Sequence, residues 1–178
     1  MLRLDFINVG YGDSILIQSI SQNRVFRILV DCGDGQTAEN RPGQKRTSAC
    51  EFLQRRNIRT LDVLVLTHMH TDHVGGLTAL TETVEIREVW TSYIPEETLF
   101  RTYKAGSGEL LEEGEKITGT LYAVFRALNR LREKGVPVRL MRGETNIPFA
   151  DWGFDLTLSS ADDSLFREQE LAFQAIPL

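Results

Sequence analysis

The segment His-Met-His-Thr-Asp-His at residues 68–73 constrains this chain more than any other stretch, because it contains every histidine of the 178-residue sequence. It follows the apolar run Leu61–Leu66, which has the nearly continuous hydrophobicity of a strand covered on both faces. Neutral imidazole and carboxylate are the ligands that zinc and other first-row divalent ions prefer. Residues two apart in an extended segment point to the same side. The spacing therefore predicts a solvent-reachable metal-binding cluster at the end of this strand, formed by His68, His70, Asp72 and His73.

The same segment has a second interpretation that needs no metal. Histidines in a polar loop after a strand can simply form hydrogen bonds. Asp72 would lie near the first turn of a helix that starts around His73 or Val74, and a helix dipole stabilises a carboxylate at that position. The combination of three imidazoles and one carboxylate after an apolar strand favours the metal site over this alternative.

Two further motifs precede the histidine segment. They are Asn-Val-Gly-Tyr-Gly-Asp-Ser at residues 8–14 and Leu-Val-Asp-Cys-Gly at residues 29–33, and the third motif continues through Gly-Gly-Leu at residues 75–77. In this order the three motifs resemble the metallo-β-lactamase superfamily. The N-terminal half is most similar to the branch that includes the hydrolase domain of competence-type DNA-uptake channel proteins. The resemblance covers about residues 2–90, weakens over about residues 91–160, and does not extend further.

The resemblance carries expectations for the site. It implies that His68 and His70 hold one ion and that Asp72 and His73 hold a second. Zinc is the expected metal, with up to two ions, and manganese or iron would be alternatives. Asp72 would also orient the water that attacks an ester, amide or phosphodiester, which makes it the expected catalytic residue. Asp31 would lie beside the metal loop and hold it in place, because groups around the direct ligands fix their orientation.

The resemblance also leaves alternatives open. The superfamily uses two more histidines and a bridging aspartate from later in the chain, whereas no histidine follows His73 here. One reading is a metal-dependent hydrolase, for which the branch favours phosphodiester or nucleic-acid substrates. A second is the same chemistry on another substrate class, such as a small-molecule lactam, thioester or lactone. The third is a truncated or degenerate, non-catalytic member that binds metal weakly or binds a protein partner.

Hydrophobic patterning predicts an α/β fold in one domain over residues 1–178. Strands at 2–6, 14–18 and 25–30 with short connections favour an antiparallel start, and Ser48 with Glu51 forms a capping box that opens a helix. Apolar residues recur at helical spacing from Leu121 to Leu131, and further strands are expected at 61–66, 86–90, 138–141 and 154–158. The resembling family implies an αββα sandwich. Because its closing strands are not accounted for, we expect an incomplete C-terminal part.

This expectation extends to partners and location. Residues 154–178 would then lie against a second copy of the chain, which gives a homo-oligomer, or would be poorly ordered. No apolar run is long enough to span a bilayer, and the N-terminus has no signal-peptide pattern. We therefore expect a cytoplasmic protein with no membrane association. The net charge of −5 argues against a protein that binds nucleic acid with its whole surface.

Overall fold

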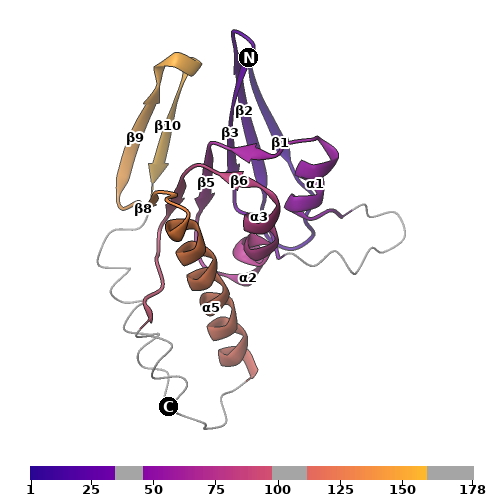
Figure 1. The fold of residues 1–178 in the computed structure, drawn as a ribbon, viewed down its shortest axis with the longest axis vertical. Coiled ribbons are helices and arrows are strands. Elements are labelled where there is room, and N and C mark those ends of the chain that lie inside the picture. The colour runs from indigo at the N-terminus through magenta and orange to yellow at the C-terminus, as the bar shows by residue number, and fades with distance from the viewer. Residues whose placement is uncertain (35–45, 98–111, 160–178) are drawn as a thin grey trace.

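A mixed six-stranded sheet lies at the centre of the computed structural model, which describes residues 1–34, 46–97 and 112–159 (Figure 1). The strand order is β1-β2-β3-β5-β7-β8. The first three strands pair antiparallel, as the sequence predicts, and β3, β5, β7 and β8 are parallel neighbours. The six strands are β1 (Leu2–Phe6), β2 (Ile15–Ser21), β3 (Arg24–Val30), β5 (Val63–Leu66), β7 (Val89–Thr91) and β8 (Val138–Leu140).

Two of the predicted strands are broken. In place of one strand over Leu61–Leu66, the chain forms β4 (Thr60–Leu61) and then β5, and β4 pairs in parallel with β6 (Glu85–Ile86). The break falls at Asp62. Its carboxylate accepts a hydrogen bond of 2.8 Å from the Arg27 amide and another of 2.8 Å from the Arg87 guanidinium. The predicted strand at residues 86–90 is divided in the same way, into β6 and β7.

The helices of the described residues pack on one face of the sheet (Figure 1). Buried leucines of this layer, such as Leu53, Leu80 and Leu128, share one core with Leu64 of β5. The predicted cap is confirmed, because the Ser48 hydroxyl accepts a hydrogen bond of 3.1 Å from the Glu51 amide. The four helices are α1 (Ala49–Arg55), α2 (Thr71–Val74), α3 (Leu77–Thr83) and α5 (Glu112–Glu133).

The helix predicted to begin around His73 is in fact two helices, because α2 ends before Gly75 and α3 begins after Gly76. Both glycines touch the backbone that follows β3. A Cβ atom on Gly75 would lie 2.3 Å from the Asp34 carbonyl oxygen, and one on Gly76 would lie 2.4 Å from the Cys32 carbonyl oxygen. Only residues without a side chain allow the chain to pass so close to this backbone.

A two-stranded hairpin covers part of the opposite face of the sheet. It consists of β9 (Glu144–Phe149), the 3₁₀ turn η1 (Ala150–Trp152) and β10 (Phe154–Ser159). The Phe149 ring lies 5.0 Å from that of Phe26 and 6.1 Å from that of Trp90, measured between ring centroids. The sequence did not predict β9, because its outward positions are polar or Pro148 and only Ile147 and Phe149 are strongly apolar.

These layers confirm the α/β class and agree with the expected sandwich, since helices, a six-stranded sheet and a second sheet follow one another. Residues 154–159 form β10, which pairs with β9 of the same chain, so this part of the tail is ordered. That a second copy lies against residues 154–178 stays a prediction. Residues 160–178 lie outside the described part. Among the described helices, none combines the length and the apolar character that a bilayer span needs.

Candidate metal centre

The histidine segment lies at the edge of the sheet where parallel strands end. Asp31 follows β3, Thr67 and His68 follow β5, and Ser92 follows β7. The Ser92 hydroxyl donates a hydrogen bond of 2.6 Å to the Thr67 carbonyl oxygen and so joins two of these strand ends. In open α/β sheets, ligands bind outside the carboxyl ends of the strands. The parallel pairing of β3, β5 and β7 therefore brings residues far apart in sequence to one edge.

The three imidazole rings lie together at this edge. The centroid of the His68 ring is 4.7 Å from that of His70 and 3.9 Å from that of His73. His70 precedes α2, and the first turn of that helix returns the chain, with the His73 amide donating to the His70 carbonyl oxygen at 2.9 Å. Asp72 lies beside them. Its Oδ2 atom is 3.5 Å from His73 Nε2, and its side chain is 46% exposed, so Asp72 and the exposed His70 lie on the solvent side of the group.

Asp31 lies beneath the rings and is 1% exposed. Its Oδ1 atom accepts a hydrogen bond of 2.8 Å from the Thr67 amide. Its Oδ2 atom accepts one of 2.5 Å from the Thr67 hydroxyl and lies 2.8 Å from His73 Nδ1. The backbone of Asp31 has φ +55°, a conformation that residues with a side chain rarely adopt. Such strain persists where surrounding contacts hold it, and it is concentrated at functional sites.

These contacts fix the tautomers of two histidines. A carboxylate only accepts hydrogen bonds, so neutral His73 carries its proton on Nδ1 and leaves the lone pair of Nε2 available. The Thr67 hydroxyl gives its proton to Asp31, so it can only accept from His68 Nδ1, which is 3.1 Å away. His68 therefore also keeps its proton on Nδ1 and presents an unprotonated Nε2. One buried carboxylate sets the metal-binding form of both rings.

Burial and neighbouring charge keep His68 neutral. Desolvation lowers the pKa of His68 below its usual 6.5, and the adjacent His73 and His70 rings lower it further. The carboxylates of Asp31 and Asp72 act in the opposite direction but do not outweigh these effects. A neutral imidazole is the form that binds a metal ion.

Ligand atoms of Asp31, His68 and His73 lie within 4.8 Å of one another, the spacing of groups that share a metal ion. Both oxygens of Asp31 already accept hydrogen bonds from Thr67 or His73. Asp31 therefore acts on the cluster through these two neighbours. Sequence reasoning assigned no role to Thr67, and its position directly before the first histidine was the one available signal.

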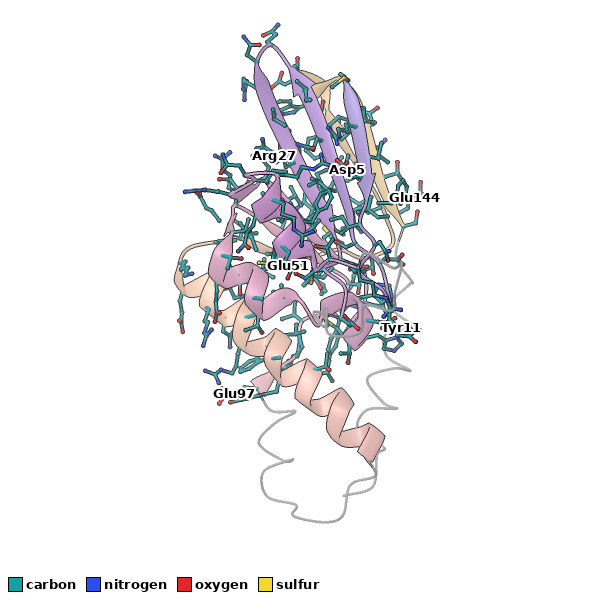
Figure 2. All side chains as sticks on the ribbon, turned by 90° about the vertical axis from the view of Figure 1, so that its right-hand side faces the viewer. Asp5, Tyr11, Arg27, Glu51, Glu97 and Glu144 are labelled. Carbon is teal, nitrogen blue, oxygen red and sulfur yellow. The ribbon has the colours of Figure 1, made fainter. Side chains whose placement is uncertain are left out.

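The loop over residues 10–13 supports the cluster from the other side. A Cβ atom on Gly12, which has φ +76°, would lie 1.6 Å from the Asp72 carbonyl oxygen, so the two backbones are in direct contact. Tyr11 is 67% exposed, and the Arg46 guanidinium lies over its ring at 5.4 Å from the centroid. Figure 2 shows Tyr11 near one end of the sheet and Asp5 further from that end. A cation and an aromatic ring thus lie at the loop whose backbone contacts Asp72.

Other candidate ligands are not part of this group. Cys32 is buried beside it, and its thiol donates a hydrogen bond of 3.3 Å to the His73 carbonyl oxygen. Burial raises the pKa of the Cys32 thiol far above its usual range, and the charge of Asp31 raises it further, so it remains protonated. Asp151 lies in η1. This turn contacts β2 at Ser19, whose hydroxyl donates a hydrogen bond of 2.9 Å to the Trp152 carbonyl oxygen. Ser19 is near the end of β2 that lies further from Ser14.

Comparison with known proteins agrees with this arrangement. A family model described as "Metallo-beta-lactamase superfamily" matches residues 7–147. The chain belongs to the metallo-β-lactamase superfamily. This membership supports a metal-dependent hydrolase function in general terms, and it extends the resemblance beyond the three N-terminal motifs.

Two curated proteins are similar to this chain. It is 30% identical over 81 residues to "ComE operon protein 3" of Bacillus subtilis, covering 41% of this chain and 10% of that protein. It is 31% identical over 104 residues to "Metallo-beta-lactamase fold-containing protein ST1585" of Sulfurisphaera tokodaii, covering 58% of this chain and 37% of that protein. The chain thus spans well under half the length of each relative.

A solved structure described as "Crystal structure of hydrolase AbOPH in beta lactamase superfamily" is also similar to the chain. It aligns with a TM-score of 0.47 and 20% sequence identity. The alignment covers 76% of this chain and 46% of that one.

Proposed function

We propose that this chain is a metal-dependent hydrolase that uses zinc and acts on phosphodiesters, with nucleic acid as the substrate class. The metal would be held by His68, His70, Asp72 and His73. The observation that carries this proposal is the hydrogen-bond chain from Asp31. It leaves the Nε2 lone pairs of His68 and His73 available to a metal ion. If the histidines only formed hydrogen bonds within a loop, no such arrangement would be required.

The donor set fits zinc. Imidazole nitrogen and carboxylate oxygen are its usual ligands besides thiolate, and the neighbouring Cys32 thiol is protonated and turned to a carbonyl group. Manganese and iron accept similar ligands and are the alternatives. Asp31 fills the role that metal sites commonly give to a carboxylate, which is to receive the second N–H of a ligating histidine.

Each residue then has a distinct task in hydrolysis. A metal ion at such a site lowers the pKa of a bound water and stabilises negative charge that develops on the substrate. The lowered pKa of His68 keeps its ring neutral and ready to bind. Asp72 is 46% exposed, so its carboxylate can reach both the histidines and the solvent and can orient and accept a proton from an attacking water. Asp31 and Thr67 hold the rings in place.

Two features favour an anionic substrate. The N-terminal motifs are most similar to the branch with competence-type DNA-uptake proteins, and one relative is "ComE operon protein 3". Tyr11 lies on the loop that touches Asp72, the Arg46 guanidinium lies over its ring, and a guanidinium beside an exposed aromatic ring suits a phosphate next to a base. Neither feature would be expected at a site for a neutral lactam.

A non-catalytic metal-binding or partner-binding role is the second candidate. The observation that favours it is the histidine count, because all three histidines lie within residues 68–73 and the superfamily draws further histidine ligands from later in its sequence. A site with fewer protein ligands would bind metal more weakly and would be less able to hold two ions.

Metal analysis followed by an activity assay separates these candidates. We expect the purified chain to bind at least one zinc ion and to hydrolyse bis-p-nitrophenyl phosphate. H68A should lose both properties, whereas D72N should lose turnover while it retains part of the metal. H70A and H73A test the remaining ligands. A chain that binds zinc but does not hydrolyse phosphodiesters, lactams or thioesters would support the non-catalytic role. A chain that binds no metal would refute both the hydrolase and the metal-binding role and would leave only the partner-binding role.

A further inference from the structure

Among the residues that the structure describes, no strand pairs with the outer edge of β1 in the six-stranded sheet. Odd-numbered residues of this strand direct their backbone groups towards β2. At its two ends, the Ile20 amide donates to the Met1 carbonyl oxygen at 2.8 Å, and the Ile7 amide donates to the Ser14 carbonyl oxygen at 2.9 Å. Hydrogen-bonded pairs alternate along an antiparallel ladder. The even-numbered residues therefore direct their N–H and C=O groups away from the sheet, and these residues are Leu2, Leu4 and Phe6.

The same three residues expose apolar side chains. Leu2 is 52% exposed, Leu4 is 49% exposed and Phe6 is 75% exposed. They share one face of the strand, and the intervening Asp5 lies on the other face, where it is 3.5 Å from Arg56 at the end of α1. The hairpin β9–β10 packs around Phe26, Trp90 and neighbouring residues, so within the described part of the chain it leaves the β1 side of this face uncovered.

β1 has few of the features that discourage pairing. Natural sheets protect open edges with charged side chains, especially lysine, with proline, with bulges or with inward-pointing charges. This strand reads Leu-Arg-Leu-Asp-Phe and contains no lysine or proline. The charges of Arg3 and Asp5 neutralise each other across a contact of 2.8 Å. The opposite edge strand, β8, is only three residues long and contains Arg139, which pairs with Glu88.

We propose that two copies of this chain associate through antiparallel pairing of their β1 strands about a two-fold axis at Leu4. In this register Leu4 faces the partner's Leu4, and Leu2 faces the partner's Phe6. These positions carry the outward-directed backbone groups, so each facing pair exchanges two backbone hydrogen bonds. The apolar stripes of both strands lie side by side on one face of a continuous sheet.

Charge selects this register among the symmetric ones. With the axis at Leu4, Arg3 lies opposite the partner's Asp5. The two residues form a non-hydrogen-bonded pair, the kind in which facing side chains are closest. Moving the axis to Arg3 would set it against the partner's Arg3. Moving it to Asp5 would oppose two aspartates. Like charges directly opposite each other are destabilising, so the strand is complementary to itself in one register only.

Opposite charge reversals test the pairing. In R3E both charged positions of the strand become acidic, and in D5R both become basic. We expect the wild-type chain to form a dimer in analytical ultracentrifugation, and each variant to raise the dimer dissociation constant by about tenfold or more. An equimolar mixture of R3E and D5R should form a heterodimer, because every opposed pair is then complementary. A variant that merely unfolded would not recover on mixing, and circular dichroism of each variant alone checks its fold.

Two further measurements locate the contact. L4K changes a half-exposed side chain, so the monomer should keep its stability while the dimer is lost. Amide exchange should slow with increasing protein concentration at Leu2, Leu4 and Phe6 but not at Arg3 or Asp5, which are already bonded to β2. A wild-type monomer up to high micromolar concentration would overturn the proposal. So would a dimer that tolerates both L4K and the charge reversals.

Discussion

Replacing Asp31 by asparagine tests whether this carboxylate prepares the histidines for metal binding. The D31N side chain keeps its volume but has one acceptor oxygen and one NH₂ group. The oxygen can still accept from the Thr67 amide. The NH₂ group then faces Thr67 Oγ1 and His73 Nδ1, the two atoms that now donate to Oδ2. His73 must therefore move its proton to Nε2, which removes the lone pair that would bind the metal.

The expected magnitudes follow from these contacts. Hydrogen bonds to a charged group contribute about 1.5–3 kcal/mol each and neutral ones about 0.5–1.5 kcal/mol. Three bonds converge on the Asp31 carboxylate, so D31N should lower the free energy of unfolding of the metal-free protein by about 3 kcal/mol. Loss of an orienting group typically weakens metal binding by about 10- to 100-fold. That range corresponds to about 1.4–2.8 kcal/mol.

Two assays separate the effects, and a second variant serves as control. Urea unfolding in the presence of a chelator gives the stability, and competition with a chromophoric chelator gives the zinc dissociation constant. D62N is the matched control, because the Asp62 carboxylate also accepts two hydrogen bonds of 2.8 Å. Asp62 lies before β5, at the other end of this strand from Thr67, and an extended chain spans about 15 Å between them. D62N should lose stability and retain zinc affinity. If D31N also retained its zinc affinity while losing stability, the argument from tautomers would be wrong.

Two further predictions concern the loop behind the cluster and its protonation. G12A should lower the free energy of unfolding by more than about 3 kcal/mol and displace the metal loop, because φ is +76° and a Cβ atom would lie 1.6 Å from the Asp72 carbonyl oxygen. The control is G119A, since a Cβ atom on Gly119 would have nothing within 4 Å. In urea unfolding G119A should be neutral or stabilising by up to about 1 kcal/mol. For pH, the folded state lowers the pKa of His68 below 6.5 and so binds fewer protons than the unfolded state. This contribution to metal-free stability is complete above pH 6.5 and is lost as pH falls through the folded-state pKa. Urea midpoints should therefore fall on acidification less steeply in H68Q than in the wild type, and equal slopes would contradict the shift.

Local signals allowed part of this fold to be predicted from sequence. The strand at residues 2–6, the Ser48 cap and the helical repeat from Leu121 to Leu131 each depend on residues close in the chain, and each is confirmed. The alternation in β1 also predicts that Leu2, Leu4 and Phe6 are buried, and this is wrong, because all three are exposed. The errors have non-local causes. The strand through Asp62 breaks because that carboxylate bonds to Arg27 of β3 and to Arg87, which lies between β6 and β7. No local pattern marks such a break, because Asp62 lies within an apolar run.

The site, too, could be predicted only where it depends on residues close in the chain. Spacing alone predicted that the three histidine rings would meet, since they lie within six residues. The link from Asp31 to Thr67 and His73 depends instead on how β3 pairs with β5. Val30 is the partner of Val65, and the Asp31 amide donates to the Val65 carbonyl oxygen at 2.8 Å, which places the carboxylate beside Thr67. A slip of one residue would turn the Asp31 side chain to the other face of the sheet. The pairing that buries the apolar core therefore also sets the tautomers of the histidines, so a substitution that shifts this register should impair metal binding without touching a ligand.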